Sequence, residues 1–132
     1  MREQEQNYES KFHPSFFDTF DDAANDMSEK EFSIFYELFQ HELRMLEKNP
    51  YSNSRECKYG ILRELGFRTM TFLSKLPRTG TGDMRIIFEV KEDAKIVNYF
   101  AVGKRINKKP RPAEDIYSKA ESILIDIQKH NN

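Results

Sequence analysis

Two β-rich segments near the end of the chain, separated by a short charged turn, most constrain its fold. Residues 82–90 (GDMRIIFEV) and 95–105 (KIVNYFAVGKR) are rich in the β-branched and aromatic residues that favour strands. The residues between them, 91–94 (KEDA), predict the turn of a hairpin. The outer ends of an antiparallel hairpin lie side by side. We therefore expect Arg85, Lys104 and Arg105 at one edge of a sheet, in a place suited to holding a phosphate.

The segments before and after this hairpin predict a mixture of helices and strands. A capping box, Ser28 with Glu31, predicts the start of a long amphipathic helix that Asn49 and Pro50 end. The chain offers the following elements: a strand at 8–12, helices at 15–25 and 28–48, a short helix at 54–65, a strand at 67–76, the two hairpin strands, and a helix at 113–128.

This order predicts an α+β fold in a single domain spanning residues 1–132, with residues 1–7 disordered. Three consecutive strands form an antiparallel meander, which the strand at 8–12 joins. We expect an antiparallel β-sheet with an N-terminal α-helical hairpin packed on one face and a C-terminal helix. One face or edge of the sheet is expected to stay open.

Composition excludes several classes of protein. The single cysteine, Cys57, has no partner for an internal disulfide, which suits a reducing cytoplasm. Cys57 also lacks a Cys-His signature of a nucleophile, and the three histidines lack metal-ligand spacing, so we expect no metal and no cofactor. We expect neither a signal peptide nor a contact with a membrane, because no apolar run approaches the roughly 18 residues of a membrane helix.

Charge is unevenly distributed along the chain. Residues 1–50 hold five Lys and Arg against twelve Asp and Glu, whereas residues 51–112 hold fourteen against six. The net charge of −1 conceals this asymmetry. It indicates either a basic working surface beside an acidic remainder or solvated charged faces without function.

Five short stretches of this sequence are informative when taken together, by their order along the chain. They are residues 8–14 (YESKFHP), 47–51 (EKNPY), 82–90, 102–105 (VGKR) and 115–117 (DIY). In this order and spacing they resemble the RelE/ParE superfamily of bacterial type II toxins, over roughly residues 8–124. The resemblance implies a RelE/ParE-like fold and a toxin held inactive by a cognate antitoxin protein.

The resemblance also implies a reaction. RelE-type toxins act on the ribosome as mRNA endoribonucleases, use the RNA 2′-hydroxyl as nucleophile, and leave a 2′,3′-cyclic phosphate. Four residues match their catalytic positions: Arg85, Arg105, Lys75 and Tyr117. A second lysine position falls on Leu73, with Arg78 as a possible substitute, and residues 108–112 look like an insertion ahead of Tyr117. The residues expected to bind RNA are Lys104, Arg78, Lys108, Lys109 and Arg111.

Other functions stay open on the sequence. ParE-type members have the same fold and poison DNA gyrase. A catalytically inactive member acting as a binding protein is also compatible, because the second lysine is missing and the sequence pI of about 6.3 is low for a ribosome-directed toxin. Each proposed site residue also has a structural alternative, such as an ion pair of Arg85 with Glu89 or Asp83, or a core position for Tyr117. Glu89, which shares a strand face with Arg85, is an alternative base.

Overall fold

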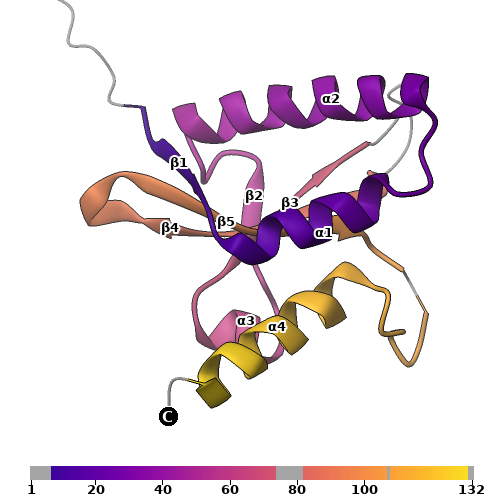
Figure 1. Ribbon diagram of the computed structural model, residues 1–132. Helices are drawn as coiled ribbons and strands as arrows, with labels where there is room; N and C mark the ends of the chain where they lie inside the picture. The colour runs from indigo at the N-terminus through magenta and orange to yellow at the C-terminus, as the bar shows by residue number, and fades with distance from the viewer. Residues whose placement is uncertain (1–6, 74–81, 107, 131–132) are drawn as a thin grey trace, which may run out of the picture.

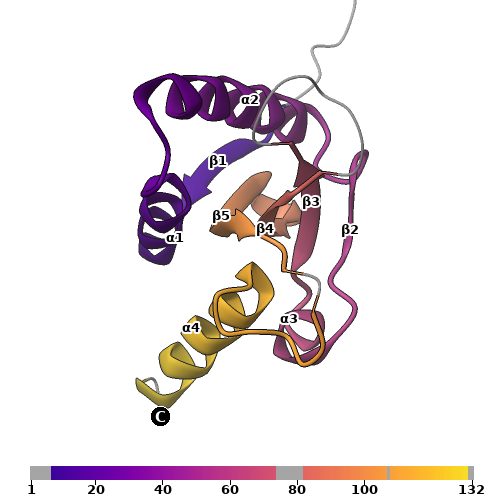
Figure 2. The same ribbon diagram turned by 90° about the vertical axis from the view of Figure 1, so that its right-hand side faces the viewer.

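The computed structural model describes residues 7–73, 82–106 and 108–130. These residues form a five-stranded sheet with strand order β1-β5-β4-β3-β2 and helices on both faces (Figures 1 and 2). The strands are β1 (Glu9–Phe12), β2 (Ser54–Glu56), β3 (Arg68–Phe72), β4 (Met84–Lys91) and β5 (Ile96–Lys104). The helices are α1 (Pro14–Ala24), α2 (Glu29–Lys48), α3 (Gly60–Glu64) and α4 (Ile116–His130), and a 3-10 turn, η1 (Glu92–Ala94), joins β4 to β5. The predicted α+β class is confirmed, while the expectation for residues 1–6 and the end of the strand predicted at 67–76 lie outside the described residues.

The predicted hairpin is confirmed, and it forms the centre of the sheet. Met84 pairs with Lys104 and Lys91 with Ile96, so β4 and β5 are antiparallel along their full length. At the turn, Lys95 takes a left-handed conformation with φ of 54°. Since β3 flanks β4 and β1 flanks β5, the two strands are not at an edge of the sheet. Only their open ends, where Arg85 and Lys104 lie, reach the sheet's border.

The outer side of β5 is covered by two different elements in turn. β1 pairs with its first half in parallel, with Phe12 opposite Tyr99. Beyond β1, helix α1 takes over: the Ser15 hydroxyl donates to the carbonyl of Phe100 at 2.8 Å, and the Val102 amide donates to the Thr19 hydroxyl at 3.0 Å. The first helix therefore satisfies backbone groups that an edge strand would leave open.

Each face of the sheet carries its own hydrophobic core, so neither face is open, while β2, the outermost strand on the β3 side, is largely exposed. Figure 2 shows α2 on one side of the sheet, α3 and α4 on the other, and α1 beside the edge where β1 and β5 lie. Alternation along β4 divides its side chains between the two cores, because Ile86 and Phe88 pack toward α1 and α2 while Ile87 packs toward α4. The predicted helical hairpin on one face is confirmed, as is its capping box, in which the Glu31 amide donates to the Ser28 hydroxyl at 3.1 Å.

The helix predicted over residues 54–65 is wrong in its first half. Residues 54–56 form β2, which extends the sheet by pairing with β3, and only Gly60–Glu64 is helical. The sequence predicted that Tyr59, Leu62 and Leu65 would share one apolar side of this helix, but only Leu62 is buried, and Tyr59 and Leu65 face solvent. The C-terminal helix begins three residues later than predicted, at Ile116, because Asp115 caps it.

Within the described part of the chain, no helix has the length and apolarity needed to cross a membrane.

Candidate functional site

The two arginines of the hairpin have different environments. Arg105 follows β5 and is exposed, and its backbone amide donates to the carbonyl of Asp83 at 3.1 Å. Arg85 is only 2% exposed. Its Nη1 donates to the carbonyls of Gly82 at 2.8 Å and Met84 at 3.0 Å, and its Nε has no hydrogen-bond partner among the described residues. Arg85 therefore lies at the open end of the hairpin as expected, but its buried guanidinium is not placed to hold a phosphate from solvent.

The burial of Arg85 follows from its place in β4. It lies opposite Gly103, on the face of the sheet that α4 covers. A Cβ at Gly103 would come within 3.0 Å of the Ile116 side chain, so helix and strand are in close contact there. Sheet and helix together shield the arginine, whose charged groups turn back to the backbone on both sides of Asp83.

A pocket of about 660 Å³ lies on the α4 side of the molecule. Its walls come from the β2–α3 segment, from the loop after β5, and from the first turns of α4. It gathers six cationic side chains against two acidic ones. The cations are Arg55, Lys58, Arg105, Lys108, Lys109 and Arg111, and the acids are Glu56 and Glu121. Such an excess of positive charge in a concave surface favours an anionic ligand.

Five of the nine site residues predicted from the sequence line this pocket: Arg105, Lys108, Lys109, Arg111 and Tyr117. Arg85 and Lys104 are not among its lining residues. Lys104 pairs with Met84, whose side chain packs in the core under α1 and α2, so it projects from the opposite face of the sheet. Lys75 and Arg78 lie outside the described residues.

Tyr117 is half-buried in the first turn of α4, with its ring at the pocket wall. Its hydroxyl lies 3.0 Å from the hydroxyl of Thr69 on β3, and the Arg111 guanidinium lies over its ring at 5.2 Å from the centroid. Residues 108–112 thus leave Tyr117 in the pocket and place Arg111 over its ring. An arginine in this position interacts favourably with the electron-rich face of the ring.

Asp115 organises the loop that carries these residues, and sequence reasoning did not single it out. Its fully buried carboxylate accepts hydrogen bonds from the amides of Ile106 at 2.6 Å and Tyr117 at 2.9 Å, and it lies 3.6 Å from Nε of Arg111. It closes the loop on itself and caps α4 at the same time. An aspartate just before a helical pattern is a capping signal, and this would have located it.

Cys57 also lines the pocket, but its thiol is not activated. Burial raises its pKa from 9.0 to about 11, and the positive charges of Arg55 and Arg68 lower it only partly. The thiol is therefore protonated at neutral pH, and a protonated thiol is a poor nucleophile.

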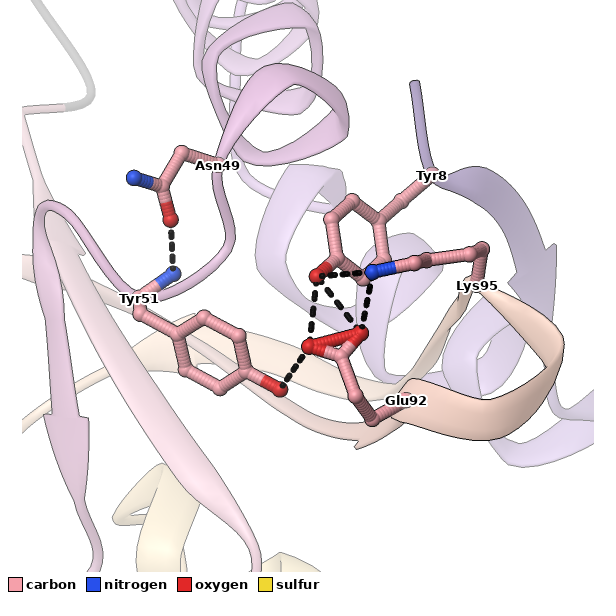
Figure 3. Close-up of polar contacts among 5 residues, drawn as sticks. All are labelled: Tyr8, Asn49, Tyr51, Glu92 and Lys95. Atoms are coloured by element: carbon pink, nitrogen blue, oxygen red, sulfur yellow. Dashed lines mark hydrogen bonds and ion pairs between the residues drawn. The ribbon is translucent and has the colours of Figure 1, made fainter. Parts of the chain in front are cut away.

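A second polar cluster surrounds the turn at the other end of the hairpin (Figure 3). The Tyr8 hydroxyl lies 2.7 Å from both carboxylate oxygens of Glu92, and Lys95 and Tyr51 donate to the same carboxylate at 2.8 and 3.2 Å. The hydrogen bond from Lys95, followed by that from Tyr8, lowers the pKa of Glu92. The three side chains that contact this carboxylate hold the turn against the residues before β1, so we assign the cluster a structural role.

No group of three or more His, Cys, Asp and Glu side chains in the described ranges has the arrangement of a metal site.

Comparison with known proteins gives similarity in structure only. No family model matches the sequence, and no curated protein matches it. The structure is similar to the toxin–antitoxin complex RelBE2 of Mycobacterium tuberculosis, with a TM-score of 0.49 and 11% identity over 79% of this chain and 98% of that one.

Two further structures are similar to a comparable degree. The archaeal RelE–RelB complex of Pyrococcus horikoshii OT3 has a TM-score of 0.47 and 15% identity over 77% of this chain and 99% of that one. A mutant of the E. coli toxin RelE in the free state has a TM-score of 0.48 and 14% identity over 91% and 96%. These similarities concern the fold alone.

Proposed function

We propose that this protein is the toxin of a toxin–antitoxin pair and an endoribonuclease that binds ribosome-associated mRNA in the basic pocket. The observation that carries the proposal is the convergence of Arg105, Lys108, Lys109 and Arg111 with Tyr117 around one pocket. Cations supply the electrostatic attraction for the RNA backbone. The reaction and the antitoxin partner are both inferred from the resemblance of the sequence to RelE-type toxins.

The proposed reaction needs three contributions. The RNA 2′-oxygen attacks the neighbouring phosphorus, the bond from phosphorus to the 5′-oxygen breaks, and the products are a 2′,3′-cyclic phosphate and a 5′-hydroxyl. A base takes the proton of the 2′-hydroxyl, and an acid protonates the leaving 5′-oxygen. Cationic donors stabilise the added negative charge on the phosphate in the transition state.

We assign the charge stabilisation and the acid to residues that line the pocket, and the base to a residue that matches the family. Arg105 is exposed in the pocket, and its guanidinium suits paired donation to phosphate oxygens. Tyr117 carries a hydroxyl that is a candidate proton donor. Lys75 is the proposed base by its match to the family.

Arg85 acts as a positioning residue in this proposal. It binds the carbonyls of Gly82 and Met84, on either side of Asp83, and the carbonyl of Asp83 binds the amide of Arg105. Arg85 therefore fixes the backbone that holds Arg105 in place. Its test is an Arg85→Lys variant, which we expect to weaken RNA binding because Arg105 is no longer held in place. In a protein that already carries Arg105→Ala, the same Arg85→Lys change should lower the RNA affinity little further.

The test of cleavage uses translated mRNA and purified ribosomes. We expect Arg105→Ala to lower the cleavage rate on the order of 10²-fold, the effect of removing one donor from a charge-stabilising site. Arg44→Ala is the matched control, because Arg44 is exposed on α2, on the other side of the sheet. The assignment of the site fails if Arg105→Ala cleaves as fast as the wild-type protein.

A second candidate function is RNA binding without cleavage. The burial of Arg85 favours it, because one of the two arginines that match the family's catalytic positions is held away from the pocket by its own backbone contacts. The two candidates differ in one measurement: a binding protein leaves the RNA intact on the ribosome while still losing affinity in Arg105→Ala.

A further inference from the structure

Tyr59 is the most exposed large apolar side chain in the described part of the chain. It is 71% exposed and lines the pocket beside Lys58 and Cys57. The hydrophobic effect disfavours a free aromatic ring in water, although single exposed residues are common. Its place at the wall of a strongly cationic pocket distinguishes this ring from an ordinary surface residue.

The backbone around Tyr59 is fixed although the ring is free. The amide of Cys57 donates to the carbonyl of Phe67 at 2.9 Å, which anchors the segment on one side. On the other side Gly60 has φ of 64° and packs so closely on α4 that a Cβ there would lie 2.7 Å from Oε2 of Glu121. The left-handed conformation and this close approach both suit glycine. The ring of Tyr59 therefore projects from a segment that is hydrogen-bonded to Phe67 on one side and packed beside the Glu121 side chain on the other.

The free face of this ring is unusual in this molecule. The other exposed aromatic rings rest against a second ring: Phe12 stacks on Tyr99 with centroids 5.0 Å apart, Phe32 stacks on Tyr36 at 5.8 Å, and Tyr51 meets the edge of Tyr8 at 6.4 Å. No ring or cation contact of Tyr59 occurs among the residues that the structure describes. A face without a partner, held beside cations, has the composition of a nucleotide site, in which a base stacks and a phosphate is neutralised.

We propose that Tyr59 is a base-stacking residue and that the pocket takes single-stranded RNA with an unpaired base on this ring. The proposal rests on the proposed binding of RNA in the pocket and adds the feature that the ligand recognises. Arg105, Lys108 and Lys109 hold the backbone phosphates, and Tyr59 accepts a base that has left the stack of its neighbours. A duplex keeps its bases stacked, so the site selects single strands.

The test measures the affinity of a short single-stranded RNA oligonucleotide for matched variants. We expect Tyr59→Ala to weaken binding on the order of 10-fold, the scale of one lost stacking contact, and Tyr59→Phe to bind as the wild-type protein does because the ring remains. An oligonucleotide of abasic ribose phosphates should bind both proteins equally, since it offers no base.

A spectroscopic readout reports the stacking directly. The chain contains no tryptophan, so Tyr59→Trp introduces a single indole whose emission can be excited apart from that of the tyrosines. Its emission should be quenched when the RNA binds and unchanged with the abasic oligonucleotide. Tyr36→Trp, on α2 across the sheet, is the control and should not respond.

The outcomes separate this proposal from the function on which it rests. If Tyr59→Ala binds RNA normally while Arg105→Ala does not, or if Tyr59→Trp is not quenched, the stacking role is refuted and the RNA site stands. If the wild-type protein and both alanine variants bind the oligonucleotide with the same negligible affinity, the RNA site itself is refuted, and a protein partner becomes the ligand to seek.

Discussion

Asp115 shows how one buried charge determines the shape of the pocket. Replacing it with alanine removes the cap of α4 and leaves the amide of Ile106 without its partner. We expect Asp115→Ala to lower the free energy of unfolding by about 3 kcal/mol, in the range for breaking a buried, hydrogen-bonded charge. Urea denaturation measures this loss, and Glu114→Ala, at the exposed neighbouring position, is the control. A loss below about 1 kcal/mol for Asp115→Ala would mean that the loop holds its shape without the carboxylate.

The Cys57 thiol gives a prediction for alkaline pH. Its pKa is about 11 in the folded protein and 9.0 as the reference value, so the unfolded chain releases this proton first as the pH rises. The contribution of Cys57 to stability is therefore present below pH 9 and is lost as the pH approaches 11. We expect the wild-type protein to lose about 1 kcal/mol more than Cys57→Ala between pH 8 and pH 10. Parallel pH profiles of unfolding free energy for the two proteins would contradict this assignment.

The two hairpin arginines show what a sequence pattern leaves undetermined at a single residue. The β-rich segments predict the hairpin and bring Arg85 and Arg105 to its open end, as the structure has them. Exposure depends on what covers each face, and the helix that covers Arg85 begins at Ile116, more than thirty residues later. Local alternation in β4 places Arg85 on the face of Ile87 but does not reveal that α4 shields that face.

At the scale of elements, α1 replaces a strand along the second half of β5. We expect Thr19→Val, which keeps the side-chain shape, to destabilise the protein by about 1–3 kcal/mol, because the buried amide of Val102 loses its acceptor. Thermal or urea unfolding measures the change. Thr71→Val is the matched control, since Thr71 is exposed on β3. Equal stabilities of the two variants would show that the helix does not serve as the cover of this edge.

Elements with a strong periodic pattern were predictable, and short ones were not. The capping box and the apolar spacing of residues 32–46 indicated α2, and the structure has both. The predicted apolar positions were Phe32, Phe35, Tyr36, Phe39, Leu43 and Leu46, of which Phe35, Phe39 and Leu46 are buried while Phe32 and Tyr36 are exposed. Strand β2 has only three residues, which are too few to show an alternation of polar and apolar side chains. Its extended conformation depends on its pairing with β3, which the sequence of β2 itself does not reveal. Tyr59 lies between β2 and α3, in the segment whose structure the sequence did not predict. For this reason the sequence did not indicate that Tyr59 lines the pocket.

At the scale of the whole molecule, the charge asymmetry of the sequence becomes a difference between two faces. The acidic first 50 residues supply α2 on one side of the sheet and α1 at its β5 edge (Figure 2). The six cations of the pocket gather on the α4 side. The net charge of −1 therefore describes neither face, and the proposed binding of RNA depends on the charge of the pocket face alone. Attraction is local to the pocket face, and the opposite face repels a polyanion, which favours one orientation of approach.

This orientation predicts how RNA binding depends on salt. Each phosphate contact on a single strand contributes about −0.7 to the slope of log K against log salt concentration. We expect Lys108→Ala combined with Lys109→Ala to make the slope shallower by about 1.4, the value for two lost contacts, as measured by titration of a single-stranded oligonucleotide at several salt concentrations. The matched control removes Lys30 and Lys48, two exposed lysines of α2, and should leave the slope unchanged. If both double variants change the slope equally, RNA responds only to net charge, and the pocket is not where its backbone binds.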